Sequence, residues 1–158
     1  MKDKEFEKIY NYAVKLLKIR DRTENELKEK LIEKGYDVKK IDEVLKKLKN
    51  YSFINDEKFV VNYIENQIKK CKNLKLIIEE LKNKFKVDCK LLNNINFEDI
   101  RKQLIENVVK LIKKKYSLHN LQKIQNFLLS KGFDFSDIEE ILNLLEREKE
   151  EDKDDYNW

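Results

Sequence analysis

The stretch IRDRTENELKEKLIEKGYD, from Ile19 to Asp37, contains the start and stop signals of a helix. Thr23 and Glu26 have the S/T-x-x-E spacing of a capping box, in which each side chain bonds the other residue's free backbone N–H. Gly35 follows the last apolar position, where a left-handed conformation after a helix favours glycine. Asp37 can then cap another helix. The stretch therefore predicts three helices: one before Thr23, one after it, and one after Asp37.

The same unit recurs twice further along the chain. Aligning Gly35 with Phe85 and then with Gly132 brings four apolar positions of each copy into register, at spacings of four, ten and four. The aligned positions are Leu27, Leu31, Ile41 and Leu45, then Ile77, Leu81, Leu91 and Ile95, then Ile124, Leu128, Ile138 and Leu142. One such copy cannot bury much surface alone, so neighbouring copies are expected to pack end to end. The predicted repeats span residues 1–50, 51–95 and 96–146.

Composition agrees with a helical fold. The chain of 158 residues contains no proline and only two glycines, whereas β folds need many turn residues. Charged residues make up 42% and apolar residues 41%, which suits amphipathic helices. The sequence therefore predicts an all-α protein, an elongated curved array of three tandem three-helix repeats. Residues 147–158 lack an apolar period and are predicted to form an acidic, disordered tail.

The charge is unevenly distributed. The net charge is +4, yet residues 146–155 carry seven acids and three bases. A run of 27 residues, 107–133, holds six lysines and no acid. A basic body favours an anionic partner such as nucleic acid or an acidic protein face, although lysine-rich helices also occur simply as solvated surfaces.

Basic residues gather where the first helix of each repeat is predicted to end. The three clusters are Lys18, Arg20 and Arg22; Lys69, Lys70 and Lys72; and Lys113, Lys114 and Lys115. A cationic stripe at the spacing of the repeats suits a periodic polyanion or filament, and the planar fork of arginine suits phosphate. The alternative is that these side chains complement helix dipoles, with Arg20 bonding nearby carbonyls or acids. We therefore treat the clusters as a hypothetical partner-binding or DNA-binding surface.

Residues for catalysis, cofactor binding or metal binding are not predicted. His119 is the only histidine and lies beside a predicted helix start, whereas a general base needs a pocket and an orienting partner. Both glycines are predicted to stop helices, so no phosphate-binding loop remains. Cys71 and Cys89 have neither disulfide nor metal-ligand spacing and fit a reducing cytosol. No signal sequence or membrane span is predicted, which favours a cytoplasmic location.

Three motifs resemble the RecX family, the bacterial regulators of the RecA recombinase. Arg20-x-x-Thr23-x-x-Glu26-Leu27-x-x-x-Leu31-x-x-Lys34-Gly35 resembles the signature of its first repeat. Residues 53–60, FINDEKFV, resemble its second landmark, with Asp56 as an acidic cap and Phe59 opening an aromatic–small pair. Ile77-x-x-x-Leu81 resembles its third. Phe85 departs from the family pattern, in which a glycine usually stands at this position, as do lysines at the end of the fourth helix, where the family often has arginines.

The resemblance implies a cofactor-free, non-enzymatic monomer that lies in the helical groove of the RecA–single-stranded DNA filament. It would modulate, and mainly inhibit, the ATPase, strand-exchange and coprotease activities of that filament. The residues predicted to be structural are Thr23, Glu26, Gly35, Asp56, Phe59 and Gly132. Two other functions stay open from the residues alone: a DNA- or RNA-binding protein that acts without a recombinase, and a helical-repeat adaptor for another protein. Residues 23–49 could also be interpreted as a helix-turn-helix, but the threefold repetition argues against that interpretation.

Overall fold

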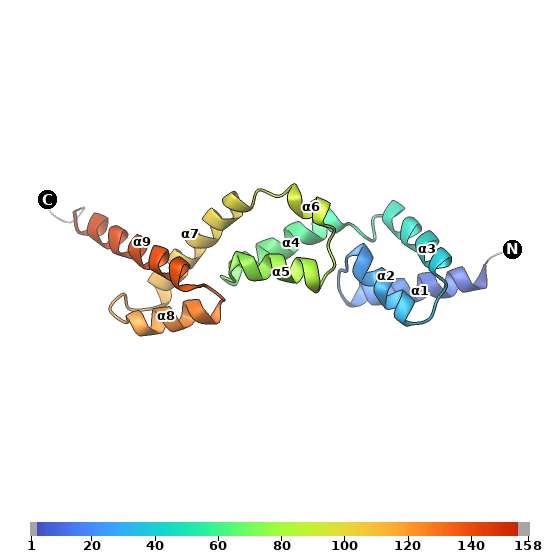
Figure 1. Ribbon diagram of the computed structural model, residues 1–158, viewed down its shortest axis with the longest axis horizontal. Coiled ribbons are helices and arrows are strands. Elements are labelled where there is room, and N and C mark those ends of the chain that lie inside the picture. The colour runs from blue at the N-terminus through green and yellow to red at the C-terminus, as the bar shows by residue number, and fades with distance from the viewer. Residues whose placement is uncertain (1–2, 155–158) are drawn as a thin grey trace. The chain divides into compact units, whose positions relative to one another are not determined.

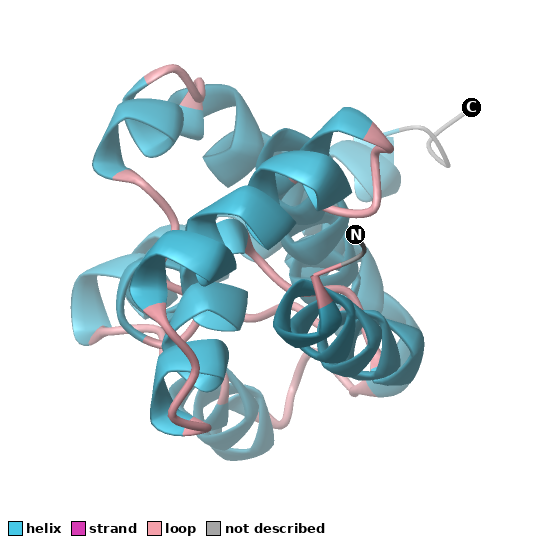
Figure 2. Cartoon of the chain, turned by 90° about the vertical axis from the view of Figure 1, so that its right-hand side faces the viewer, coloured by secondary structure: helices cyan, strands magenta, loops and turns pink. Residues whose placement is uncertain are grey.

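The computed structural model describes residues 3–154, and every regular element in that range is a helix (Figures 1 and 2). The helices are α1 Lys4–Ile19, α2 Glu24–Glu33, α3 Val38–Asn50, α4 Asp56–Lys69, α5 Leu74–Asn83, α6 Cys89–Asn93, α7 Phe97–Lys115, α8 Leu121–Ser130 and α9 Phe135–Asp154. The all-α prediction and the order of three successive helix triplets are confirmed. No helix within the described range is both long and apolar enough to cross a membrane.

The signals in residues 19–37 produce the predicted helix ends. Thr23 Oγ1 accepts the N–H of Glu26 at 3.2 Å and so caps α2. Gly35 has φ +93°, and the N–H of Tyr36 bonds the carbonyl of Leu31 at 3.4 Å, which is the Schellman arrangement. The predicted bond from the backbone N–H of Thr23 to the Glu26 side chain is wrong. Arg20 and Arg22 bind the Glu26 carboxylate instead.

The second repeat ends its hairpin differently. Gly132 has φ +86°, as its alignment with Gly35 predicts, but the left-handed residue after α5 is Lys86, with φ +55°, and not Phe85. Moving the turn by one residue frees Phe85 from the conformation that a glycine favours. Its ring is buried, with centroids 5.1 Å from Phe59 and 4.8 Å from Tyr63. The departure at Phe85 therefore adds an aromatic side chain to the core.

The repeat alignment identifies the core. Nine of the twelve aligned apolar positions are buried, and the other three (Leu91, Ile95 and Leu142) are half-buried. Burying a leucine or isoleucine side chain contributes roughly 1.5–3 kcal/mol relative to exposure. Spacings of four residues place such side chains on one face of each helix, so the same pattern generates a similar buried face in every copy.

Packing groups the helices into two compact units. The first comprises the residues up to Ile64 together with Ile78–Ile95, and the second comprises Glu65–Ile77 together with the residues from Asn96 onward. The chain passes between the units at three places, of which two fall inside helices, in α4 and α5, and the third falls between α6 and α7. The three-repeat domain boundaries at residues 50 and 95 therefore stay a prediction, and the description below takes each unit by itself.

The prediction of a disordered tail is wrong for residues 147–154, which continue α9. Leu145 is buried and anchors the helix one turn earlier. Beyond it, Glu148 forms an ion pair with Lys113, and Lys149 Nζ donates to the carbonyl of Leu118 at 3.4 Å. Tertiary contacts of this kind stabilise a helix whose sequence has no apolar period. The remainder of the predicted tail, residues 155–158, lies outside the described residues.

Replacing Gly132 by alanine should destabilise the protein more than replacing Gly35. Both exchanges place a side chain on a left-handed residue, which costs about 1 kcal/mol. A Cβ at Gly35 meets no other atom within 4 Å, whereas a Cβ at Gly132 overlaps the side chain of Leu76. We expect losses of about 1 kcal/mol for Gly35→Ala and about 2 kcal/mol for Gly132→Ala, measured by urea unfolding. Equal losses would mean that Leu76 moves aside without cost.

Candidate partner-binding surface

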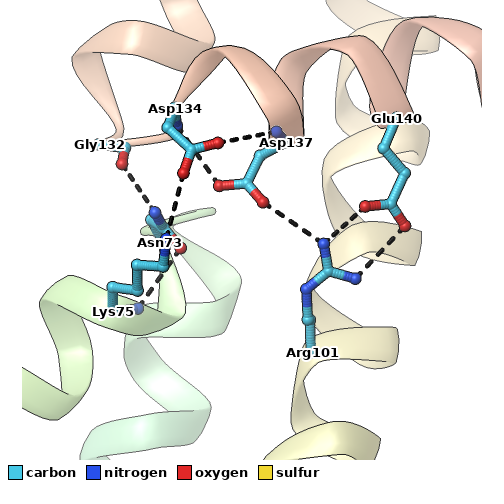
Figure 3. A network of polar contacts seen from close by, with 7 residues as sticks. All are labelled: Asn73, Lys75, Arg101, Gly132, Asp134, Asp137 and Glu140. Atoms are coloured by element: carbon cyan, nitrogen blue, oxygen red, sulfur yellow. Dashed lines mark hydrogen bonds and ion pairs between the residues drawn. The ribbon is translucent and has the colours of Figure 1, made fainter.

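A hydrogen bond between successive repeats occurs twice at equivalent positions. In the first unit, the Thr23 hydroxyl donates to the carbonyl of Phe85. In the second, Asn73 Nδ2 donates to the carbonyl of Gly132 at 2.7 Å (Figure 3). Thr23 and Asn73 are the caps of α2 and α5, and Phe85 and Gly132 are the aligned hairpin ends of the next repeat. Each cap side chain therefore serves its own helix and also holds the following repeat.

A second polar contact accompanies each of these bonds. Asn25 Nδ2 donates to the carbonyl of Lys86 at 3.0 Å in the first unit. Lys75 Nζ pairs with Asp134 at 3.1 Å in the second unit (Figure 3). Asn25 and Lys75 are aligned by the same offset of 50 residues as their capping neighbours. We call each pair of contacts an inter-repeat joint.

The first basic cluster is largely part of the internal structure. The Arg22 side chain is only 9% exposed, and it donates to the Leu16 carbonyl and to Glu26, both at 3.3 Å. Arg20 also bonds Glu26, and its guanidinium carbon lies 5.6 Å from the centre of the Phe85 ring. Two guanidinium groups thus neutralise one buried carboxylate, an arrangement in which loss of either partner is costly. Arg22 is therefore removed from the candidate surface, and Arg20, which is 42% exposed, belongs mainly to this network. Lys18 is exposed and stays a candidate.

Residues of the second landmark are structural in a way that differs from the prediction. Asn55 caps α4, accepting the N–H of Lys58 at 3.1 Å. Asp56, predicted as that cap, accepts the N–H of Glu24 at 2.9 Å and so caps the start of α2. Burial raises the pKa of the Asp56 carboxyl, although this hydrogen bond opposes the shift. Phe59 packs against the ring of Phe85.

Parts of the second and third basic clusters meet in the second unit. Lys69 at the end of α4 and Lys114 near the end of α7 line one shallow depression of about 260 Å³. Lys110 lies one turn before Lys114 and lines the same depression. All three lysines are exposed. We call this site the basic depression; its remaining lining residues are Cys71, Asn107 and Leu111.

The backbone at the end of α4 creates this site. Cys71 has φ +57° and is buried, while the N–H of Lys72 bonds the carbonyl of Gln67 at 3.2 Å. This Schellman turn directs the small thiol inward and leaves Lys69 on the surface. Burial raises the pKa of the Cys71 thiol, with the charge of Lys131 acting in the opposite direction. The thiol is therefore protonated at neutral pH and supplies an apolar floor, not a nucleophile.

The other lysines of these clusters do not line the basic depression. Lys70 is exposed and Lys72 half-buried at the same end of α4. Lys113 is paired with Glu148, and Lys115 lies 5.8 Å from the centre of the Tyr116 ring. Lys110 was missed from the predicted set, although its spacing of four residues from Lys114 places both on one helix face. That spacing is the signal that would have identified it.

The arrangement is suited to binding an anion. Three ammonium groups around an apolar floor attract phosphate or carboxylate and have no preference for a base sequence. Within residues 3–154, no group of three or more histidine, cysteine or acidic side chains is placed to hold a metal ion. His119 is exposed on the turn after α7, where its backbone N–H bonds Ser117 Oγ at 3.4 Å.

Comparisons with known proteins agree with the fold and with the motifs. The family model described as "RecX, first three-helix domain" matches residues 10–48. The "Regulatory protein RecX" of Clostridium perfringens strain 13 is 34% identical over 144 residues, 85% of this chain and 67% of that protein. That of Caldanaerobacter subterraneus subsp. tengcongensis is 31% identical over 85% of this chain and 68% of its own. The crystal structure of RecX from Lactobacillus salivarius matches with a TM-score of 0.70 and 26% identity, covering 90% of this chain and 97% of that one. The chain therefore belongs to the RecX family of regulatory proteins.

Proposed function

We propose that this protein regulates the RecA recombinase by binding the RecA–single-stranded DNA filament in its helical groove, and that it mainly inhibits the filament. The observation that carries the proposal is the basic depression, where Lys69, Lys110 and Lys114 converge from two repeats. A filament wrapped on DNA presents negative charge at a regular spacing, which a basic protein built from repeats can follow. Family membership supports the regulatory role.

In this proposal the protein inhibits the filament by occupying its groove and does not catalyse a reaction. A protein bound in the groove adds contacts to one conformational state of the filament, and it shifts the equilibrium only as far as its affinities for the two states differ. The inter-repeat joint of the second unit supports this mode of action because it ties the repeat that carries Lys69 to the repeat that carries Lys110 and Lys114. A preformed surface loses less conformational entropy on binding than a flexible one. We infer that the protein acts in the cytoplasm as a monomer and without a cofactor.

The direct test is the single-stranded DNA-dependent ATPase of RecA from the same organism, measured while this protein is titrated. We expect the rate to fall at ratios well below one regulator per recombinase, because a regulator bound in a groove or at a filament end affects several subunits. A separate titration with DNA in large excess shows whether the protein merely removes free DNA. An unchanged ATPase rate at equimolar protein would contradict the proposal.

The basic depression also supports a second candidate, a nucleic-acid-binding protein that acts without a recombinase. Its lysines do not depend on RecA to attract phosphate. Binding to single-stranded DNA with a steep salt dependence, together with an unchanged RecA ATPase, would favour this candidate over the first.

A further inference from the structure

The acidic end of α9 lies against the basic end of α7. The two helices pack against each other within the second unit. Residues 146–154 of α9 carry six acids and three bases, whereas the last turn of α7 contains Lys113, Lys114 and Lys115. Opposite charges therefore meet next to the basic depression, since Lys114 lines it and Lys113 is its neighbour.

Specific contacts hold α9 on α7 at two places. Near the start of α9, Arg101 of α7 pairs with Glu140 at 2.6 Å and with Asp137 at 3.4 Å (Figure 3). The Arg101 guanidinium lowers the pKa of the Glu140 carboxyl, so that this pair stays charged at neutral pH. Further along, Lys113 pairs with Glu148. The second contact is thus made by a helix that is already fixed at its beginning.

The position of Glu148 follows from the buried face of α9. Ile141 and Leu145 are buried, and Glu148 follows Leu145 by three residues, on the adjoining part of the same face. Lys149 reaches the carbonyl of Leu118 beyond the end of α7. Both partners of the Lys113–Glu148 pair are partly exposed, at 37% and 41%, so the pair can open to solvent.

We propose that the acidic end of α9 is an internal competitor, which competes with a bound polyanion for Lys113 and for the neighbouring basic depression. Glu148 forms an ion pair with Lys113 in the free protein. The surrounding acids lower the positive potential over the basic depression. A phosphate backbone must displace Glu148 to reach Lys113. The inference rests on the proposed function in that both assign an anionic partner to this surface. It adds that the affinity of the surface is set by a segment of the same chain.

The expected size of the effect follows from the exposure of the pair. Exposed ion pairs are weak, which corresponds to a change in affinity of about two- to fivefold. Glu148→Gln should therefore tighten binding to a single-stranded oligothymidylate by about two- to fivefold at low salt. The gain should shrink as salt is raised, because added ions screen both the pair and the surrounding acids.

The test compares Glu148→Gln with Glu139→Gln in the full chain. Glu139 is an exposed acid on the second turn of α9, so the control has the same change in charge on the same helix without a contact to Lys113. Fluorescence anisotropy of a labelled oligothymidylate gives the affinity at several salt concentrations, and circular dichroism confirms that helix content is unchanged. Two further proteins, Lys113→Gln and Lys113→Gln with Glu148→Gln, show whether the gain passes through Lys113.

Tighter binding by Glu148→Gln alone, lost in the Lys113→Gln background, would support the internal competitor. Equal affinities for the wild type, Glu148→Gln and Glu139→Gln would overturn it, and so would a lack of oligothymidylate binding by all of them. None of these results depends on the RecA ATPase, so the competitor can fail while the proposed regulation of RecA stands, and the reverse also holds.

Discussion

Exchanging Lys69, Lys110 and Lys114 together for glutamate should weaken binding to single-stranded DNA by roughly a hundredfold at about 0.1 M salt. For a single strand, each phosphate that a lysine neutralises contributes a salt slope of about 0.7, so three lost contacts correspond to about two powers of ten. The slope of affinity against salt should fall by about two for the same reason. Anisotropy titrations over a range of salt concentrations measure both quantities.

The matched control is the triple exchange of Lys30, Lys39 and Lys46 for glutamate. These lysines are exposed on α2 and α3, and their exchange changes the net charge by the same amount. A comparable loss in the control would show that net charge, and not the basic depression, determines binding. Titrating the RecA ATPase with both variants extends the comparison to the filament. An unchanged affinity and an unchanged inhibition would remove the depression from the proposed function.

Local sequence signals predicted most of the fold because they act within one helix. Thr23, Gly35 and Asp37 end or begin helices through bonds to residues at most four positions away. The apolar spacing of four residues identified the buried faces for a similar reason. Phe85 is an exception. The alignment predicted a left-handed conformation for it, but Lys86 adopts that conformation and the ring of Phe85 enters the core.

The candidate site was harder to predict because it depends on contacts between segments far apart in the sequence. Arg22 has the composition of a phosphate ligand, yet a carboxylate and a carbonyl of its own repeat bind it. Lys110 lies outside the clusters at the helix ends, yet packing places it beside Lys69 from another repeat. The acidic end of α9 has no apolar period, and its helix depends on contacts with α7 and the turn that follows it. The pattern of charges in the sequence does not determine which of them are already paired.

Replacing Thr23 by valine should destabilise the first unit by about 3 kcal/mol. Valine has nearly the same shape, but it lacks the hydroxyl that accepts the N–H of Glu26 and donates to the carbonyl of Phe85. Thr23 is fully buried, so water cannot replace either bond. Losing a cap costs about 1 kcal/mol, and leaving a buried carbonyl unsatisfied costs about 1–3 kcal/mol. Urea unfolding followed by circular dichroism measures the loss.

Thr23→Ser separates the hydrogen bonds from the packing of the side chain. Serine keeps the hydroxyl and loses one methyl group, which costs about 1 kcal/mol. If valine and serine destabilised the protein equally, the hydrogen bond between Thr23 and Phe85 would contribute little, and apolar packing together with the Asn25 contact would hold the repeats. A large loss for valine alone would mean that one residue both starts α2 and fixes the next repeat against it. Asn73 would then be expected to start α5 and fix the third repeat against it in the second unit, because it also caps its helix and bonds the carbonyl of Gly132.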